Sequence, residues 1–236
     1  MCGARRLPTF GRMANALLDL TRAAHITAGG VALVTLWIPL LAAKGARLHR
    51  RAGWIYTWAM AVVALSGAGL AAVAFATGHR PRSAFLGYVA LLTASNTWLG
   101  IRALSRSASP VARAVDFAFP AALAAASLVL GVYGAAMRSV LFVGFAILGA
   151  VLGASQLVEW LGTAPRRQGR VLRHMTGMGG SCIATLTAFL VVNAGRVGLG
   201  GSVLPWFLPG IGGTIVIVVW RRRLERAGTH GLARTR

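Results

Sequence analysis

Two histidines in this sequence share a local pattern, in which a short basic segment leads directly into an apolar helix. His49 lies in KGARLHRRAGWIYTWAM, residues 44–60, and His174 lies in GRVLRHMTGMGGSC, residues 169–182. A neutral imidazole donates a lone pair to a metal, and it titrates close to physiological pH. These two segments are therefore the first candidates for a functional site.

Two carboxylates are expected at the same membrane depth as these histidines, one early in the fourth apolar span and one late in the fifth. Two imidazoles and two carboxylates suit a divalent first-row metal or a proton relay. The four members of this expected cofactor pocket are His49, His174, Asp116 and Glu159. The alternative is ordinary ion pairing, of Asp116 with Arg113 and of Glu159 with the basic 161–173 segment, beside histidines that only reach toward lipid headgroups.

A second set of metal ligands follows from the helical spacing after His174. Met178 and Cys182 stand at i+4 and i+8, so all three side chains share one helical face. Imidazole, thioether and thiol together suit Cu(I), which is a soft ion. With His49 from the other segment, this set predicts a metal site. The competing interpretation is that Met178 and Cys182 fill a packed helix interface.

Haem is a third candidate ligand, because two histidines from different helices can hold its iron from opposite faces. His49 and His174 are expected on the same side of the membrane, as such a site requires. However, His49 precedes its helix, and the sequence has no CxxCH motif for covalent attachment. The cofactor therefore stays open between a metal ion and haem.

Other polar residues are expected away from this site. His25 begins the first span, and about 19 residues, or roughly 28 Å of helix, separate it from Lys44. It is interpreted either as a second, outer site or as an interfacial histidine. Asn193 lies at the outer end of the sixth span, and Asn96, near the middle of the third, is expected to form a hydrogen bond with another helix.

The composition predicts the elements that must position these residues. Hydrophobic residues make up 56% of the chain and charged residues 12%, against roughly a quarter charged in soluble domains. We therefore expect an all-α, polytopic helical membrane bundle of about seven transmembrane helices, each long enough to cross a core of about 30 Å. The predicted spans are 24–43, 54–76, 84–104, 112–133, 139–160, 172–194 and 203–220.

The charge distribution predicts the orientation of the chain. Most of the 25 Lys and Arg residues fall in the segments 44–53, 102–113, 161–173 and 221–236, so the amino terminus is expected outside and the carboxyl terminus inside the bacterial inner membrane. These basic loops are expected to contact anionic headgroups. Because they alternate with apolar runs, nucleic acid is not an expected partner.

The transmembrane domain, residues 24–220, is expected between two basic ends. Residues 1–23 form a basic amino-terminal segment in which Met13 is an alternative start, and residues 221–236 form a basic cytoplasmic tail. Pro205 and Pro209, together with three glycines, predict a bent or broken last helix. The small residues around Gly149 and Gly153 predict close helix approach, which suits internal packing as well as a homo-oligomer.

Three stretches resemble bacterial membrane proteins of the family called domain of unknown function 2306. They are HITAGGVAL from His25, the 44–60 segment, and RHMTGMGGSCIATLTAFLVVN from Arg173. The resemblance implies a polytopic membrane fold and no particular reaction. The residues that match the pattern of that family, and that the resemblance implies are of interest, are His25, Lys44, Gly45, His49, Arg50, Gly53 and His174.

Motifs of known enzyme classes are absent from the sequence, which has no GxSxG, HExxH or Walker loop, so an enzyme is not expected. The expected function is an integral inner-membrane protein that binds a metal ion or haem at the cytoplasmic side. One alternative is a transporter or channel for protons or a small solute, whose broken last helix lines the path. The other is a membrane scaffold subunit with no site of its own.

Overall fold

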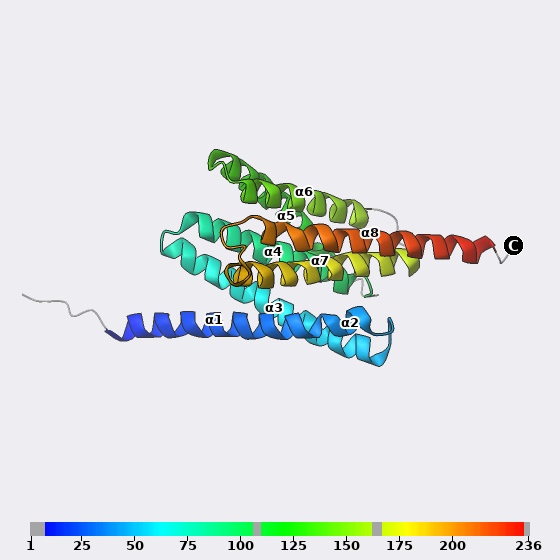
Figure 1. The fold of residues 1–236 in the computed structure, drawn as a ribbon, viewed down its shortest axis with the longest axis horizontal. Helices are drawn as coiled ribbons and strands as arrows, with labels where there is room; N and C mark the ends of the chain where they lie inside the picture. The colour runs from blue at the N-terminus through cyan, green and yellow to red at the C-terminus, as the bar shows by residue number, and fades with distance from the viewer. Residues whose placement is uncertain (1–7, 106–109, 162–166, 234–236) are drawn as a thin grey trace, which may run out of the picture.

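The computed structural model describes residues 8–105, 110–161 and 167–233, and in these ranges the chain is helical and contains no strand (Figure 1). The elements are α1 (Pro8–Thr35), α2 (Trp37–Leu41), α3 (Arg47–Ala76), α4 (Arg80–Arg102), α5 (Pro110–Ala136), α6 (Val140–Leu161), α7 (Arg167–Asn193), the short 3₁₀ helix η1 (Ala194–Val197) and α8 (Leu204–Ala233).

Seven helical segments of the described residues are long and apolar enough to cross a membrane. They overlap the seven predicted spans one for one, which confirms the all-helical fold class and supports the multi-pass membrane class. The segments are Asn15–Leu41, Arg47–Ala76, Arg80–Arg102, Arg113–Ala136, Val140–Leu161, Gly169–Val197 and Leu204–Leu224.

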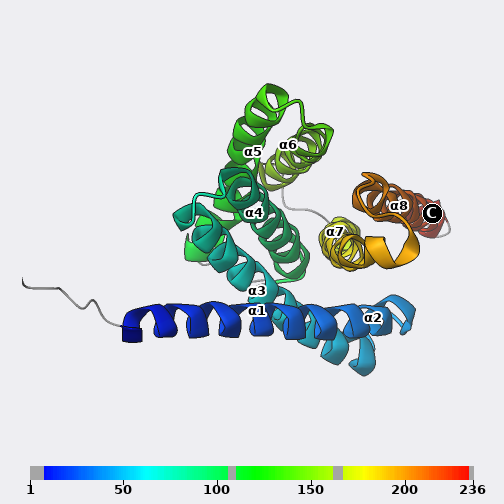
Figure 2. The same cartoon turned by 60° about the vertical axis from the view of Figure 1, so that its left-hand side comes forward.

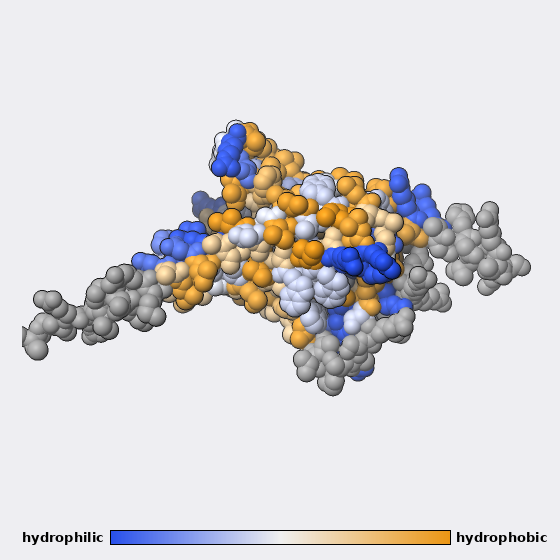
Figure 3. Space-filling model, turned by 90° about the horizontal axis from the view of Figure 1, so that it is seen from below, coloured by the Kyte–Doolittle hydropathy of each residue, from blue (hydrophilic) through white to orange (hydrophobic). Residues whose placement is uncertain are grey.

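The outer surface of the bundle is apolar along much of its length. Figure 3 shows hydrophobic residues over the middle of the molecule and hydrophilic ones mainly toward the ends of its long axis. Large apolar side chains such as Leu65 (75% exposed) and Val192 (81% exposed) point outward. Contiguous apolar surface of this extent is costly in water and favourable against lipid.

Helix α4 is the central element of the bundle. It packs against α3, α5 and α7, while α1 packs on α3, α6 on α5 and α8 on α7. Figure 2 shows α4 in the middle, with the pairs α1–α3, α5–α6 and α7–α8 arranged around it. The glycines Gly149 and Gly153 of α6 face inward, where a Cβ on Gly153 would lie 2.9 Å from Pro120 O of α5. This pair of small residues therefore serves internal packing.

Two clusters of buried apolar side chains form the core. One lies among α4, α5 and α6 and consists of Phe85, Tyr88, Leu92, Leu123, Leu130, Phe142, Phe145 and Ala146. The other lies where the first span meets α3 and α7 and consists of Ala32, Leu36, Tyr56, Ala59, Met60 and Cys182. The second cluster matters for function because α3 and α7 carry the two candidate histidines.

Of the predicted bend or break in the last helix, the break is wrong, because α8 runs as one helix with Pro209 inside it. Pro205 stands in the first turn of α8, where the missing N–H would have had no helical partner. The interruption lies instead in the first span, between α1 and α2. There Pro39 cannot donate to Thr35 O, and its ring crowds that carbonyl, so α1 ends at Thr35.

Candidate functional site

The site begins at the corner between α2 and α3. The last carbonyls of α2 have no helical partner, and Lys44 Nζ donates to two of them, Pro39 O at 2.8 Å and Leu40 O at 2.7 Å. Gly45 has a φ of +80°, a left-handed conformation that suits glycine. Arg50 Nη1 donates to Gly45 O at 2.7 Å, so a side chain from the first turn of α3 also holds the corner in place.

Lys44 also connects this corner to the last helix. Its Nζ lies 5.4 Å from the centre of the Trp220 ring on α8, within the range of a cation–π contact. Desolvation lowers the pKa of Lys44. The Lys-Gly and His-Arg pairs in this segment therefore have specific structural roles, which together fix the position of His49 at the start of α3.

His49 is oriented by the same helix end. Its Nδ1 lies 3.0 Å from Pro39 O, the carbonyl that Lys44 also binds. A carbonyl oxygen only accepts, so Nδ1 carries the proton and Nε2 keeps its lone pair. The ring is partly buried. His49 therefore has a defined tautomer with one nitrogen available to a ligand.

His174 has the same arrangement on a different helix. Its Nδ1 lies 2.7 Å from Gly100 O, a carbonyl in the last turn of α4, so its Nε2 also keeps a lone pair. The contact requires α7 to approach α4 closely. A Cβ on Gly177 would lie 2.7 Å from Gly100 Cα and 2.8 Å from Asn96 O, closer than a Cβ can pack. Glycines on both helices therefore bring His174 to the end of α4.

The two histidine rings meet at the end of the bundle where α2 ends and α3 and α7 begin, which we call the histidine end. Their centroids are 6.3 Å apart and their planes are inclined by 62°. With metal–nitrogen bonds of about 2.1 Å, two rings that share one ion have centroids at most about 6.5 Å apart. Ligand histidines also commonly donate their other N–H to a carbonyl, as both do here.

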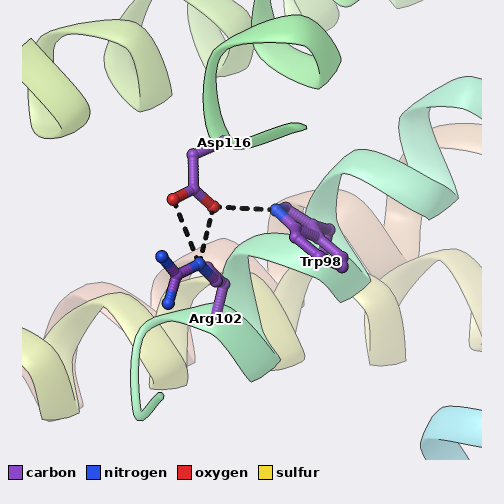
Figure 4. A network of polar contacts seen from close by, with 3 residues as sticks. All are labelled: Trp98, Arg102 and Asp116. Carbon is purple, nitrogen blue, oxygen red and sulfur yellow. Dashed lines mark hydrogen bonds and ion pairs between the residues drawn. The ribbon is translucent and has the colours of Figure 1, made fainter. Parts of the chain in front are cut away.

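Asp116 is held by two donors from α4 (Figure 4). Trp98 Nε1 donates to Oδ1 at 3.0 Å, and Arg102 Nε lies 3.1 Å from both carboxylate oxygens. The residue is only 3% exposed. A carboxylate buried this deeply needs a compensating cation, which Arg102 supplies. Asp116 therefore joins α5 to α4.

Glu159 is also paired. Its Oε2 lies 3.5 Å from Arg173 Nε, and Arg173 Nη2 donates to the main-chain oxygen of Glu159. The guanidinium group lies 5.2 Å from the centre of the Trp160 ring. The ion pair of Glu159 with Arg173 joins the end of α6 to the start of α7. It is the pairing with the basic 161–173 segment that the sequence analysis gave as the alternative to a cofactor pocket.

The four-residue pocket predicted from the sequence is not formed. In residues 8–105, 110–161 and 167–233, no three His, Cys, Asp or Glu side chains are grouped so that they could hold a metal ion. The structure brings together His49 and His174 only. Asp116 and Glu159 lie in ion pairs with arginines instead. The buried carboxylate of Asp116 needs such a cation to compensate its charge, and the carboxylate of Glu159 is partly exposed.

The predicted soft-metal set of His49, His174, Met178 and Cys182 is also not formed as a group. Cys182 is 8% exposed and belongs to the apolar cluster with Tyr56. Met178 packs on that cluster and against α4, where its Cγ would lie 2.7 Å from a Cβ on Gly100. Both sulfur side chains therefore fill a helix interface, as the competing interpretation expected.

Sequence reasoning missed a buried hydroxyl cluster between α3, α4 and α7. The Tyr56 hydroxyl lies 2.9 Å from Ser181 Oγ and 3.1 Å from Thr185 Oγ1, and Thr97 Oγ1 lies 2.9 Å from Ser181 Oγ. The Tyr56 side chain is fully buried. A signal for this cluster does exist in the sequence, because Tyr56 and Ser181 each stand seven residues, or two helical turns, after a candidate histidine.

Asn96 forms the interhelical hydrogen bond that the sequence predicted. Its Oδ1 accepts from Gln156 Nε2 of α6 at 3.2 Å, and Gln156 Oε1 accepts from Ser95 Oγ at 2.7 Å. Asn96 is also next to Gly180 of α7, where a Cβ would lie 3.2 Å from its side chain. This polar group therefore connects α4 to α6 at a position where α7 also packs.

His25 and Asn193 do not take part in the histidine pair. His25 Nδ1 lies 2.9 Å from Ser66 Oγ, which itself donates to Val62 O. Ser66 stands 17 residues after His49 on α3, about 25 Å along the helix. Asn193 makes local contacts, donating to Phe189 O at 2.8 Å and accepting from Arg196 at 2.6 Å.

No protein-family model, curated protein or solved structure matches the chain. The resemblance to the domain of unknown function 2306 proteins is therefore neither supported nor contradicted by these comparisons. Function is inferred below from the geometry of the histidine end.

Proposed function

We propose that this chain is a multi-pass protein of the bacterial inner membrane that binds a metal ion or haem through His49 and His174. The supporting observation is the pair of partly buried rings, 6.3 Å apart, whose Nδ1 atoms both lie on main-chain carbonyls. Both tautomers leave a lone pair on Nε2, and the separation of the ring centroids lies within the limit for one shared ligand.

The residues present fit such a ligand. His49 and His174 would hold it, and the carbonyls of Pro39 and Gly100 orient the two rings. Imidazole suits Zn, Cu, Fe and Ni, and two protein ligands leave other coordination positions to water or a substrate. A bound haem or redox metal would supply electron transfer. Asp116 and Glu159 keep their ion pairs in this proposal.

We place the histidine end on the cytoplasmic side. Lys44, Arg47, Arg50 and Arg51 are all exposed at the α2–α3 corner, and basic loops are held inside by the positive-inside rule. On α3, Trp58 is 68% exposed, as expected of a side chain near the membrane interface. The amino terminus is then outside, the carboxyl terminus is inside, and the basic loops contact anionic headgroups.

Absorption spectra and elemental analysis of detergent-purified protein test the proposal. We expect a Soret band or stoichiometric metal in the wild type, and its loss in both His49→Ala and His174→Ala. His79→Ala is the matched control, because His79 is exposed at the opposite end of α3 and contacts Thr77 there. A folded wild type that takes up neither haemin nor Zn²⁺, Cu²⁺ or Fe²⁺ would contradict the proposal.

Transport of protons or a small solute is the second candidate, and a specific observation favours it. The hydroxyls of Tyr56, Ser181 and Thr97 continue the polar interior by two turns beyond the histidines. Beyond Thr185, however, the neighbouring side chains of the second cluster, Ala32 and Met60 among them, are apolar. A ligand-free protein whose proteoliposomes conduct protons would make transport the better proposal.

A further inference from the structure

Three contacts between α3 and α7 join residues that are all 125 positions apart in the sequence. They are the ring contact of His49 with His174, the hydrogen bond of Tyr56 with Ser181, and the contact of Thr185 Oγ1 with Met60 Sδ at 3.3 Å. A constant offset means that the helices run parallel and in register. The positions i, i+7 and i+11 lie on one face of each helix, so these faces form a seam at which side chains of α3 and α7 meet while both helices pack on α4.

The middle contact of this seam is its strongest polar link. Tyr56 is fully buried, and its single hydroxyl meets two hydroxyls of α7, on Ser181 and Thr185. Thr97 of α4 also bonds Ser181, so the bond network includes the helix whose Gly100 carbonyl orients His174. In a lipid environment few competing partners are available to these groups, which favours the one register that satisfies them.

The register of α3 against α7 decides whether the histidines can share a ligand. A slip of one residue moves a helix by 1.5 Å and turns its face by about 100°. The observed centroid separation of 6.3 Å is already close to the limit of about 6.5 Å for one shared ion. A change of register would therefore carry the two rings outside that limit.

We propose that Tyr56 is a positioning residue for the histidine site, whose hydroxyl fixes the register of α3 against α7 and so holds His49 and His174 at ligand-sharing distance. This inference rests on the proposed function for its ligand. The geometric part concerns the two helices alone and can be measured without any ligand.

Tyr56→Phe removes the hydroxyl and keeps the ring that packs in the second cluster. The matched control is Tyr88→Phe, because Tyr88 is also buried but its hydroxyl bonds Ser127 Oγ and Phe145 O, away from α3 and α7. With Zn²⁺ as the probe in equilibrium dialysis, we expect Tyr56→Phe to weaken binding roughly tenfold, as loss of a supporting contact does elsewhere. Tyr88→Phe should bind like the wild type.

A ligand-free measurement separates the positioning role from the proposed function. Spin labels on His49→Cys and His174→Cys, in a background with Cys2→Ser and Cys182→Ala, report the separation of the two positions by dipolar broadening. Adding Tyr56→Phe should reduce the broadening, and adding Tyr88→Phe should not. A reduced broadening in a protein that takes up neither haemin nor Zn²⁺, Cu²⁺ or Fe²⁺ would uphold the positioning role and refute the proposed ligand site.

Equal Zn²⁺ affinity and equal dipolar broadening for Tyr56→Phe and the wild type would overturn the inference. Should Tyr56→Phe not fold in detergent, the double variant Ser181→Ala with Thr185→Val removes both hydrogen bonds of the Tyr56 hydroxyl from the α7 side and is read in the same two measurements. Its result then decides the proposal in the same way.

Discussion

The carboxylate of Asp116 is almost completely enclosed, and its charge is compensated by one arginine of the preceding helix. Removing one partner of a buried pair leaves an uncompensated charge, which typically costs about 3–5 kcal/mol. We therefore expect Arg102→Met to lower the free energy of unfolding by that amount, measured by thermal or denaturant unfolding in detergent. The double variant Arg102→Met with Asp116→Asn should recover much of the loss, because no buried charge then remains.

The exposed pair of Arg22 and Asp19 provides the control for this measurement. Its side chains are 55% and 73% exposed and lie 3.4 Å apart. Surface pairs contribute about 0–1 kcal/mol, so Arg22→Met should leave stability nearly unchanged. Equal losses for Arg102→Met and Arg22→Met would show that the buried pair has no special structural role.

For single residues, the sequence predicted which side chains are of interest better than it predicted the residues that those side chains contact. His49 and His174 could be found because each lies in a basic segment that leads into an apolar helix, and the structure brings their rings together. The arginine partner of Asp116 could not be identified in the same way. Arg102 lies 14 residues away on another helix, and the choice among 24 arginines depends on how α4 packs against α5.

Between elements, the crossing of α4 and α7 depends on glycine. A Cβ on Gly177 would meet the backbone of Gly100, which cannot move aside as a flexible side chain can. We expect Gly177→Ala to lower the free energy of unfolding by about 1–3 kcal/mol, typical of overpacking, and to separate His174 from the Gly100 carbonyl. Thermal unfolding in detergent measures the first effect, and Zn²⁺ affinity measures the second.

Gly53 of α3 gives the matched control, because a Cβ there would meet no atom within 4 Å. Alanine in a helix interior is favoured over glycine by about 0.5–1 kcal/mol, so Gly53→Ala should be neutral or stabilising. If Gly177→Ala is as well tolerated as Gly53→Ala, the close crossing is not what positions His174.

The elements also show why helix breaks are hard to predict from proline alone. Pro205 and Pro209 in the last span suggested a bend or break, yet α8 is continuous, with Pro205 in its first turn and Pro209 inside it. Pro39 does interrupt its span, and α2 then ends so soon that the carbonyl of Pro39 is left to accept from both Lys44 and His49. Whether a proline ends a helix depends on its place in the helix and on the surrounding packing, which the proline does not itself determine.

For the whole molecule, the all-helical class and the seven long apolar helices follow from length and hydrophobicity, and both are confirmed. The neighbour of each helix does not follow from composition. The contact of α4 with α7, and the hydroxyl cluster around Tyr56, connect segments more than 70 residues apart through side-chain packing. Ordinary Ser, Thr and Tyr residues reveal such a cluster only when the helices are placed together.

Sidedness is tested on the whole molecule in the membrane. In a background with Cys2→Ser and Cys182→Ser, we expect a membrane-impermeant maleimide to label His79→Cys but not Arg47→Cys in spheroplasts. In inverted membrane vesicles the pattern should reverse, because basic loops are retained inside. Both replaced residues are exposed, so accessibility reports the side of the membrane. Labelling of Arg47→Cys in spheroplasts would contradict the proposed orientation.

The measurement that tests the central claim most directly is a double-mutant cycle of ligand binding at the two histidines. Whichever ligand the wild type takes up, haemin or a named metal ion, is titrated into the wild type, His49→Ala, His174→Ala and the double variant. We predict one ligand per chain, near-complete loss in each single variant, and no further loss in the double variant, because groups that act on one ligand are not additive. Losses that simply add, or a single variant that binds like the wild type, would contradict a shared site.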